Sequence, residues 1–313
     1  MLLNHLCLTP MALTDAPEEG GIVLRSLYSV LCGYIGNETV QGILLVVSVL
    51  LCIASAYLIG SINPAIIFSN KIYHEDIRSH GSGNAGATNI LRTYGKRMAA
   101  LIFAIDFSKA IIAVLIGSLI LSITVGGAIS ALFVVLGHMF PVFHKFKGGK
   151  GVACTAACIL MLSPLSFAIL LPMFIVIVLC TKYISLGSIM CALLFPLFAF
   201  SLRNVFWGGG GFITLSAIMI AGFVVFMHRE NIKRLAEGKE NKISLSKKSK
   251  QDGEVKAQES KPKESAPKKE YSDDNFIKCS CGRIIPKTRE VCVYCGEKNP
   301  YFIPTENKKN KKK

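Results

Sequence analysis

The sequence predicts an all-α membrane protein that crosses the bilayer several times. Hydrophobic residues make up 51% of the 313 positions, charged residues only 18%, and the mean hydropathy is +0.48. Several apolar runs approach about 20 residues, the length that a helix needs to cross a hydrocarbon core of about 30 Å. Lys and Arg collect in the segments between these runs, as the positive-inside rule describes.

We expect about seven transmembrane helices. The apolar run 152–181 is too long for one span and is interrupted at Ser163-Pro164, where proline removes a backbone donor and turns the chain. It is therefore divided into two short helices. The expected helices are 43–68, 98–121, 125–143, 152–163, 165–181, 185–202 and 211–227.

Because the chain changes sides at each crossing, seven crossings at these positions place the basic segments on one side of the membrane. The segments 69–97, 143–151 and 181–184 are basic, as is the chain after 228, and only Arg203 departs from this bias. The pattern predicts an outside N-terminus and a cytoplasmic C-terminus in the cell membrane. The formal charge of +15 could instead suggest nucleic acid, but the lysine-rich stretch 239–269 contains no aromatic residue for base stacking.

Composition divides the chain into five parts. We expect an N-terminal extension (1–42), a membrane domain (43–240), a disordered basic linker (241–270), a small compact module (271–305) and a lysine-rich tail (306–313).

The segment between the first two crossings has the composition of an anion site. Three glycines, Gly81, Gly83 and Gly86, let the backbone curl and present its amides ahead of a helix. A flexible glycine loop would explain these glycines but not the donors beside them. Those donors are Arg78, Ser82, Asn84, Thr88, Asn89 and Arg92.

A second candidate site is Lys150, which stands among Gly148, Gly149 and Gly151 at the start of a helix. Unhindered backbone around an ammonium group suits phosphate binding. The nearby Lys145 and Lys147 could instead be anchors that reach the membrane interface. His138, at the end of the preceding crossing, could be either a ligand or a structural residue.

The last crossing ends in a third polar group. His228 and Asn231 lie three residues apart and so share one helical face. The histidine alone could be structural, bound to the carbonyl groups of a helix end, but the asparagine favours a functional site. A transporter would carry charges inside its spans. The spans are nearly free of charge apart from Asp106 and Lys109, which either satisfy each other or line the site.

Residues 45–240 resemble the bacterial acyl-phosphate-dependent glycerol-3-phosphate acyltransferases, which are membrane-integral enzymes. Five blocks carry the resemblance, in the order of the family. They are Gly60-Ser-Ile-Asn-Pro-Ala65, the loop Gly81 to Asn89 with Arg92, Lys147-Gly-Gly-Lys-Gly-Val-Ala153, Thr181 to Ser188, and His228-Arg-Glu-Asn231 with Arg234, Leu235 and Gly238.

The resemblance implies transfer of a fatty acyl group from acyl phosphate to the sn-1 hydroxyl of glycerol-3-phosphate beside membrane lipid, forming lysophosphatidic acid without a catalytic cofactor. By resemblance, Ser82 and Arg92 bind glycerol-3-phosphate and Lys150 contacts phosphate. Ser185, in preference to Ser188, completes the site with His228 and Asn231. His228 could act as the base, or a substrate phosphate oxygen could take the proton. The His-x4-Asp motif of many acyltransferases that use thioester donors is absent.

The C-terminal module carries four cysteines in two close pairs. Cys279 and Cys281 form the first pair, Cys292 and Cys295 the second, and a glycine follows each. Four thiolates in this arrangement suit a structural zinc ion, with free reduced thiols as the alternative. We expect a zinc-ribbon-like module, which could bind a protein partner. The other seven cysteines are scattered among apolar residues, where they pack as small hydrophobes.

Overall fold

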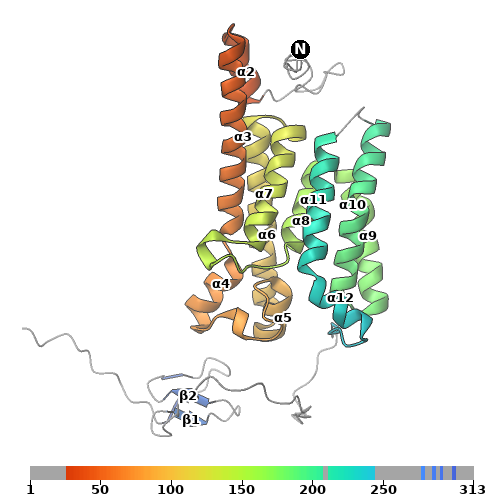
Figure 1. Cartoon of the computed structure of the whole chain (residues 1–313). Helices are drawn as coiled ribbons and strands as arrows, with labels where there is room; N and C mark the ends of the chain where they lie inside the picture. Colours follow the sequence, from red (N-terminus) through yellow and green to blue (C-terminus); the bar gives the residue numbers. More distant parts are fainter. Residues whose placement is uncertain are drawn as a thin grey trace, which may run out of the picture. The chain divides into compact units, whose positions relative to one another are not determined.

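The computed structural model describes residues 26–206 and 211–243 and, closer to the C-terminus, 276–278, 284–286, 290–291 and 298–300. The chain divides into two compact units, residues 1–247 and 248–313. In the described residues, the first unit is helical (Figure 1) and the second contains two short strands.

The helices of the first unit follow the apolar pattern of the sequence. Short 3-10 or π turns at Ser69–Tyr73, Ile77–Ser79, Ile123–Gly127 and Val142–His144 connect some of them. In chain order, the helices are α2 (Leu27–Tyr34), α3 (Glu38–Ser61), α4 (Pro64–Phe68), α5 (Ala87–Tyr94), α6 (Lys96–Ile120), α7 (Ala128–Met139), α8 (Val152–Leu162), α9 (Pro164–Thr181), α10 (Ile184–Phe206), α11 (Gly211–Met227) and α12 (Arg229–Ala236).

The structure corrects the expected number of seven transmembrane helices. In the part of the chain that is described, five helical segments are long and apolar enough to span a membrane, and the bent pair α11–α12 raises the number to six. The difference is α8, whose 11 residues extend about 17 Å, roughly half of a hydrocarbon core.

The predicted break in the long apolar run is confirmed. Ser163 ends α8, and Pro164 occupies the first turn of α9, where a missing backbone donor is harmless. The hydroxyl groups of Ser163 and Ser166 lie 2.6 Å apart and are hydrogen-bonded. The chain therefore reverses here between two apolar helices.

Small residues allow the helices to approach closely at their centre. A Cβ atom on Gly60 of α3 would collide with the Val134 backbone of α7, and one on Gly137 would collide with the Tyr57 carbonyl. Large apolar side chains such as Leu50 and Leu197 are exposed on the outside of the unit. This distribution, with small residues between helices and large ones facing outward, is typical of helices packed in lipid.

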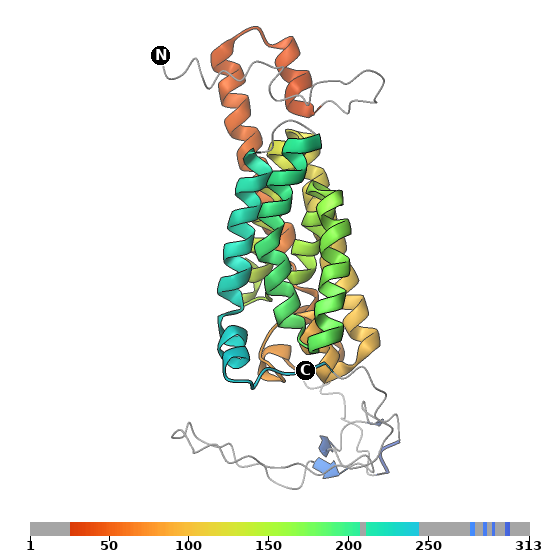
Figure 2. The same ribbon diagram turned by 90° about the vertical axis from the view of Figure 1, so that its right-hand side faces the viewer.

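The polar segments gather at one end of the helical unit. Figures 1 and 2 show α4, α5 and α12 at the same end, where hydrogen bonds join Lys150 to Asn231 and Ser185 to Glu240. Residues 241–243 belong to this end, although we expected a linker from 241, because the Ile243 amide donates to the Lys182 carbonyl at 2.8 Å.

The described part of the second unit consists of paired backbone segments. Strand β1 (Phe276–Lys278) pairs antiparallel with β2 (Ile284–Pro286), and Val291 pairs with Lys298. Cys279, Cys281, Cys292 and Cys295 lie outside the described residues, as do most of the expected linker and the lysine-rich tail.

Candidate active site

The first glycine loop is held in shape by a buried asparagine. The Asn89 side-chain oxygen accepts from the Ser82 amide at 2.9 Å, and its nitrogen donates to the carbonyls of Ile77 (3.1 Å) and His80 (2.9 Å). Gly81 has a φ of 57°, and a Cβ atom there would collide with the Asn89 side chain. The side-chain amide of Asn89, which we predicted to bind substrate, is thus hydrogen-bonded to the loop itself.

The other predicted residues of this loop remain available to a ligand. Ser82, Gly83 and Arg92 are exposed, Asn84 and Thr88 are half-buried, and Gly86 caps the start of α5. Within the described residues, the side chains of Ser82, Asn84, Thr88 and Arg92 make no hydrogen bond or ion pair to the protein. The Arg92 guanidinium lies within electrostatic reach of Glu240 and of Arg234 on α12.

The second loop brings Lys150 to the end of the last crossing. The amides of Gly148 and Gly149 donate to the carbonyls of Met139 (3.1 Å) and His138 (3.2 Å), which docks the loop on the end of α7. The Lys150 ammonium donates to the side-chain oxygen of Asn231 on α12. Two of the three predicted polar groups are therefore in direct contact.

Glu240 is a central residue of the site that the sequence analysis missed. One of its carboxylate oxygens accepts from Asn231 at 2.7 Å and from Ser185 at 3.0 Å, and the other lies 2.9 Å from Arg234. The only signal in the sequence is an acidic residue two positions after Gly238, at a boundary that we placed at 240. Burial alone would raise the pKa of Glu240, but hydrogen bonds from Asn231, Arg234 and Ser185 hold it below its ordinary value.

Lys150 is a weaker base than an ordinary lysine. Burial, assisted by the positive charges of Arg234 and Arg92, lowers its pKa to about 8, although Glu240 opposes the change. Its charge therefore responds to pH within the physiological range.

Ser185 and His228 both lie at this end of the unit. The Ser185 hydroxyl bonds Glu240, whereas the Ser188 hydroxyl donates to the Ile184 carbonyl within its own helix. His228 is 2% exposed, with Nδ1 2.7 Å from the Val224 carbonyl oxygen. Nδ1 must therefore carry the proton in the neutral ring, which leaves Nε2 as an acceptor.

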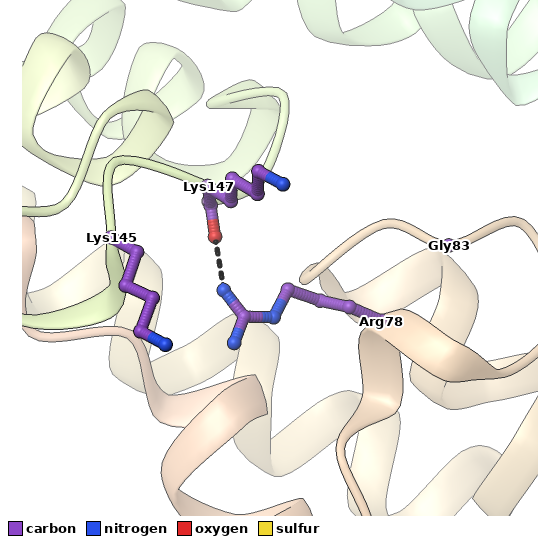
Figure 3. Close-up of a pocket in the computed structure, with 5 residues that line it drawn as sticks. Arg78, Gly83, Lys145 and Lys147 are labelled. Carbon is purple, nitrogen blue, oxygen red and sulfur yellow. Dashed lines mark hydrogen bonds between the residues drawn. The ribbon is translucent and has the colours of Figure 1, made fainter.

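An open cavity of about 490 Å³ lies between the two loops and is lined by Arg78, Gly83, Lys145, Lys147 and Gly148. Figure 3 shows Arg78 reaching across from the first loop to the Lys147 carbonyl, a hydrogen bond of 3.1 Å. Its guanidinium is paired with Asp76 at 2.7 Å and also donates to the His144 carbonyl at 3.0 Å. Arg78 thus joins the loops, while Lys145 and Lys147 are exposed.

Three buried side chains deeper in the unit could in principle hold a metal ion. The donor atoms of Asp106, His138 and Cys154 lie within 4.8 Å of one another. The Lys109 ammonium, however, is 2.8 Å from Asp106 and 3.1 Å from His138. The ammonium already supplies the positive charge that a metal ion would bring, so the group is an ion-pair cluster. Of the two alternatives expected from the sequence, Asp106 and Lys109 follow the first, in which they pair with each other.

Comparisons with known proteins agree with this arrangement. The family described as glycerol-3-phosphate acyltransferase matches residues 50–238. Among curated glycerol-3-phosphate acyltransferases, that of Thermoanaerobacter sp. (strain X514) is 45% identical over 188 residues, which is 60% of this chain and 92% of that protein. That of Bacillus subtilis (strain 168) is 35% identical and is covered over 96% of its length.

Solved structures give the same result. The crystal structure of PlsY (YgiH), an integral membrane glycerol 3-phosphate acyltransferase, in its glycerol 3-phosphate form is 36% identical, with a TM-score of 0.58. The match covers 63% of this chain and 96% of that one. Its lysophosphatidic acid form gives 35% identity and a TM-score of 0.56. The chain therefore belongs to the glycerol-3-phosphate acyltransferase family and is an integral membrane enzyme of phospholipid synthesis.

Proposed function

We propose that the chain transfers a fatty acyl group from acyl phosphate to the sn-1 hydroxyl of glycerol-3-phosphate, giving lysophosphatidic acid and inorganic phosphate. The observation that carries this proposal is the meeting of Lys150, Asn231 and Ser185 around Glu240, with Arg92 and Arg234 nearby. Cations and neutral donors together suit phosphate groups. These groups lie at the end of lipid-facing helices, where the acyl chain of a substrate could extend into the membrane.

The unpaired donors of the first loop would hold the glycerol-3-phosphate. Among the described residues, the side chains of Ser82 and Arg92 make no hydrogen bond or ion pair, and the exposed backbone at Gly83 permits close approach of an anion. Lys150 would stabilise the negative charge that develops on the departing phosphate. Because acyl phosphate is already activated, holding the two substrates in line supplies much of the rate.

The hydroxyl proton has two possible acceptors. The unprotonated Nε2 of His228 is chemically suited to take it. A phosphate oxygen of a substrate is the other acceptor. Replacing His228 with Gln keeps a hydrogen-bonding side chain but removes the base, so it separates these routes: a large loss of kcat supports His228, and a small loss supports the phosphate oxygen.

We place this site on the cytoplasmic side of the cell membrane. The basic segments 69–97, 143–151 and 181–184 connect helices at the end where the site is built, and the positive-inside rule assigns that end to the cytoplasm. The direction of the chain still alternates through α8 and α9, because it reverses at Ser163. An outside N-terminus and a cytoplasmic C-terminus therefore stay the preferred topology.

The test is turnover by purified protein in bilayers supplied with acyl phosphate and glycerol-3-phosphate. We expect equimolar lysophosphatidic acid and inorganic phosphate. Lys150→Ala should lower kcat by about 10²- to 10³-fold, the usual effect of removing a group that stabilises developing charge. Lys96→Ala, which removes an exposed lysine at the start of α6, is the matched control. Equal turnover with acyl-CoA would contradict the assignment of the donor.

We also propose a structural zinc ion in the C-terminal module. Each cysteine pair falls, in sequence, between two paired backbone segments: Cys279 and Cys281 between β1 and β2, and Cys292 and Cys295 between Val291 and Lys298. This order is compatible with two metal knuckles. We expect one zinc per chain in the full-length protein and loss of that zinc in Cys292→Ser. Four freely titrating thiols and no zinc would contradict the proposal.

A further inference from the structure

A buried ionic cluster lies behind the two glycine loops. Asp106 and Lys109 of α6 and His138 of α7 are each less than 10% exposed. The Lys109 ammonium lies 2.8 Å from the Asp106 carboxylate, and His138 Nδ1 lies 3.2 Å from the same carboxylate oxygen. Charged groups in a membrane interior are costly and are usually kept for a function.

Lys109 connects the cluster to the first loop. Its ammonium donates to the carbonyls of Gly60 (3.0 Å) and Ile62 (2.6 Å), where α3 ends and these groups have lost their helical partners. Asn63 follows directly, and its side-chain nitrogen donates to the Ala85 carbonyl at 3.3 Å. Ala85 is part of the loop that carries Ser82 and Asn84. Lys109 therefore fixes the turn after α3, and Asn63 in that turn holds the first loop.

His138 connects the cluster to the second loop. Its carbonyl accepts from the Gly149 amide at 3.2 Å. A Cβ atom on Gly149 would collide with both His138 Nε2 and the Ala85 carbonyl. Gly149 therefore lies against the imidazole ring on one side and the first loop on the other, and Lys150 is the next residue.

We propose that Asp106, Lys109 and His138 are positioning residues that set the separation between the first loop and Lys150. The cluster holds both loops from behind, and Gly149 is the point at which the loops and the cluster meet. The proposal rests on the phosphate-binding roles proposed above for Lys150 and the first loop. None of the three residues is required to touch substrate.

Two variants of His138 test the roles of the two ring nitrogens separately. In His138→Asn, the amide occupies the place of Nδ1 and preserves a polar contact with Asp106, but nothing replaces Nε2 beside Gly149. In His138→Gln, the amide reaches the place of Nε2. We expect His138→Asn to keep the thermal midpoint of the wild type and to raise KM for glycerol-3-phosphate at least tenfold, with a smaller change in kcat. His138→Gln should recover most of that loss.

The charged pair is tested as a neutral double variant, Asp106→Asn with Lys109→Gln, so that no unpaired charge is left in the membrane interior. It should also raise KM for glycerol-3-phosphate. Ser216→Ala is the control, because the Ser216 hydroxyl is buried and, among the described residues, donates to the Ile213 carbonyl of its own helix.

Calorimetric binding of glycerol-3-phosphate without acyl donor gives a second readout that is independent of turnover. We expect weaker binding in His138→Asn and wild-type binding in Ser216→Ala. Unchanged KM and binding in folded His138→Asn and double variant would overturn the proposal, as would a loss matched entirely by a lower thermal midpoint. A wild-type protein that binds glycerol-3-phosphate but forms no product would instead contradict the proposed reaction.

Discussion

The ammonium of Lys150, on the loop before α8, donates to the side-chain oxygen of Asn231 on α12, although the two residues are 81 positions apart. The other end of the Asn231 amide donates to Glu240. The Asn231 amide therefore bridges the Lys150 ammonium and the Glu240 carboxylate, and these two contacts fix its orientation. Lys150, which we propose binds phosphate, is held by a residue of α12 rather than by one of its own loop.

Ser185 and Ser188 form a matched pair for testing this network. Ser185→Ala removes a donor to the Glu240 carboxylate, whereas Ser188→Ala removes a bond within α10. Hydrogen bonds to charged groups contribute about 1.5–3 kcal/mol, so we expect Ser185→Ala to lower kcat/KM by about ten- to hundredfold. Ser188→Ala should stay near the wild-type value. Steady-state phosphate release measures both, and equal effects would remove Ser185 from the site.

Glu240 should be needed for both activity and stability. Glu240→Ala leaves Asn231, Ser185 and Arg234 without their shared acceptor, and buried unsatisfied donors cost about 1–3 kcal/mol. We expect a lower thermal midpoint in detergent and a loss of kcat/KM of at least tenfold. Glu237→Ala is the control, because Glu237 is exposed and its carboxylate pairs with the exposed Lys239 at 3.2 Å. Wild-type kinetics in Glu240→Ala would show that the network is dispensable.

Phosphate binding should weaken above about pH 8, the pKa of Lys150. The folded-state pKa is below the ordinary lysine value, so the ammonium is present below pH 8 and is lost as the pH rises through it. Removing the negative charge in Glu240→Gln should lower the pKa further and move the alkaline limb of kcat/KM to lower pH. In Lys150→Arg, which stays charged, the limb should disappear from the pH profile. An unchanged limb in this variant would assign it to another group.

Gly81 should tolerate no side chain. Its positive φ is strained for other residues, and a Cβ atom would displace the Asn89 side chain that holds the loop. We expect Gly81→Ala to raise KM for glycerol-3-phosphate by about an order of magnitude or more, on the scale of about 1–3 kcal/mol of strain. Gly222→Ala, where a Cβ atom meets nothing within 4 Å, is the control. A wild-type KM in Gly81→Ala would mean that the loop adapts without cost.

The sequence by itself determined the membrane class, the break at Ser163-Pro164 and the segments that form the site. These features depend on local properties: apolar length, a missing proline donor, and glycines beside donors. The contents of the polar blocks also indicated phosphate chemistry, with Lys150, Ser185 and Asn231 among the residues that the structure brings together.

Only the tertiary structure decided how these residues are used. An acidic residue after Gly238 does not by itself identify Glu240 as a site residue, because its role depends on donors from α10 and α12 that meet only when the helices pack. Packing between segments also places His138 against Gly149, whereas the partners of the Asn89 amide all lie in its own loop. Hydrogen bonds and charge pairs act over a few ångströms, so their partners become known only when distant segments are placed in space.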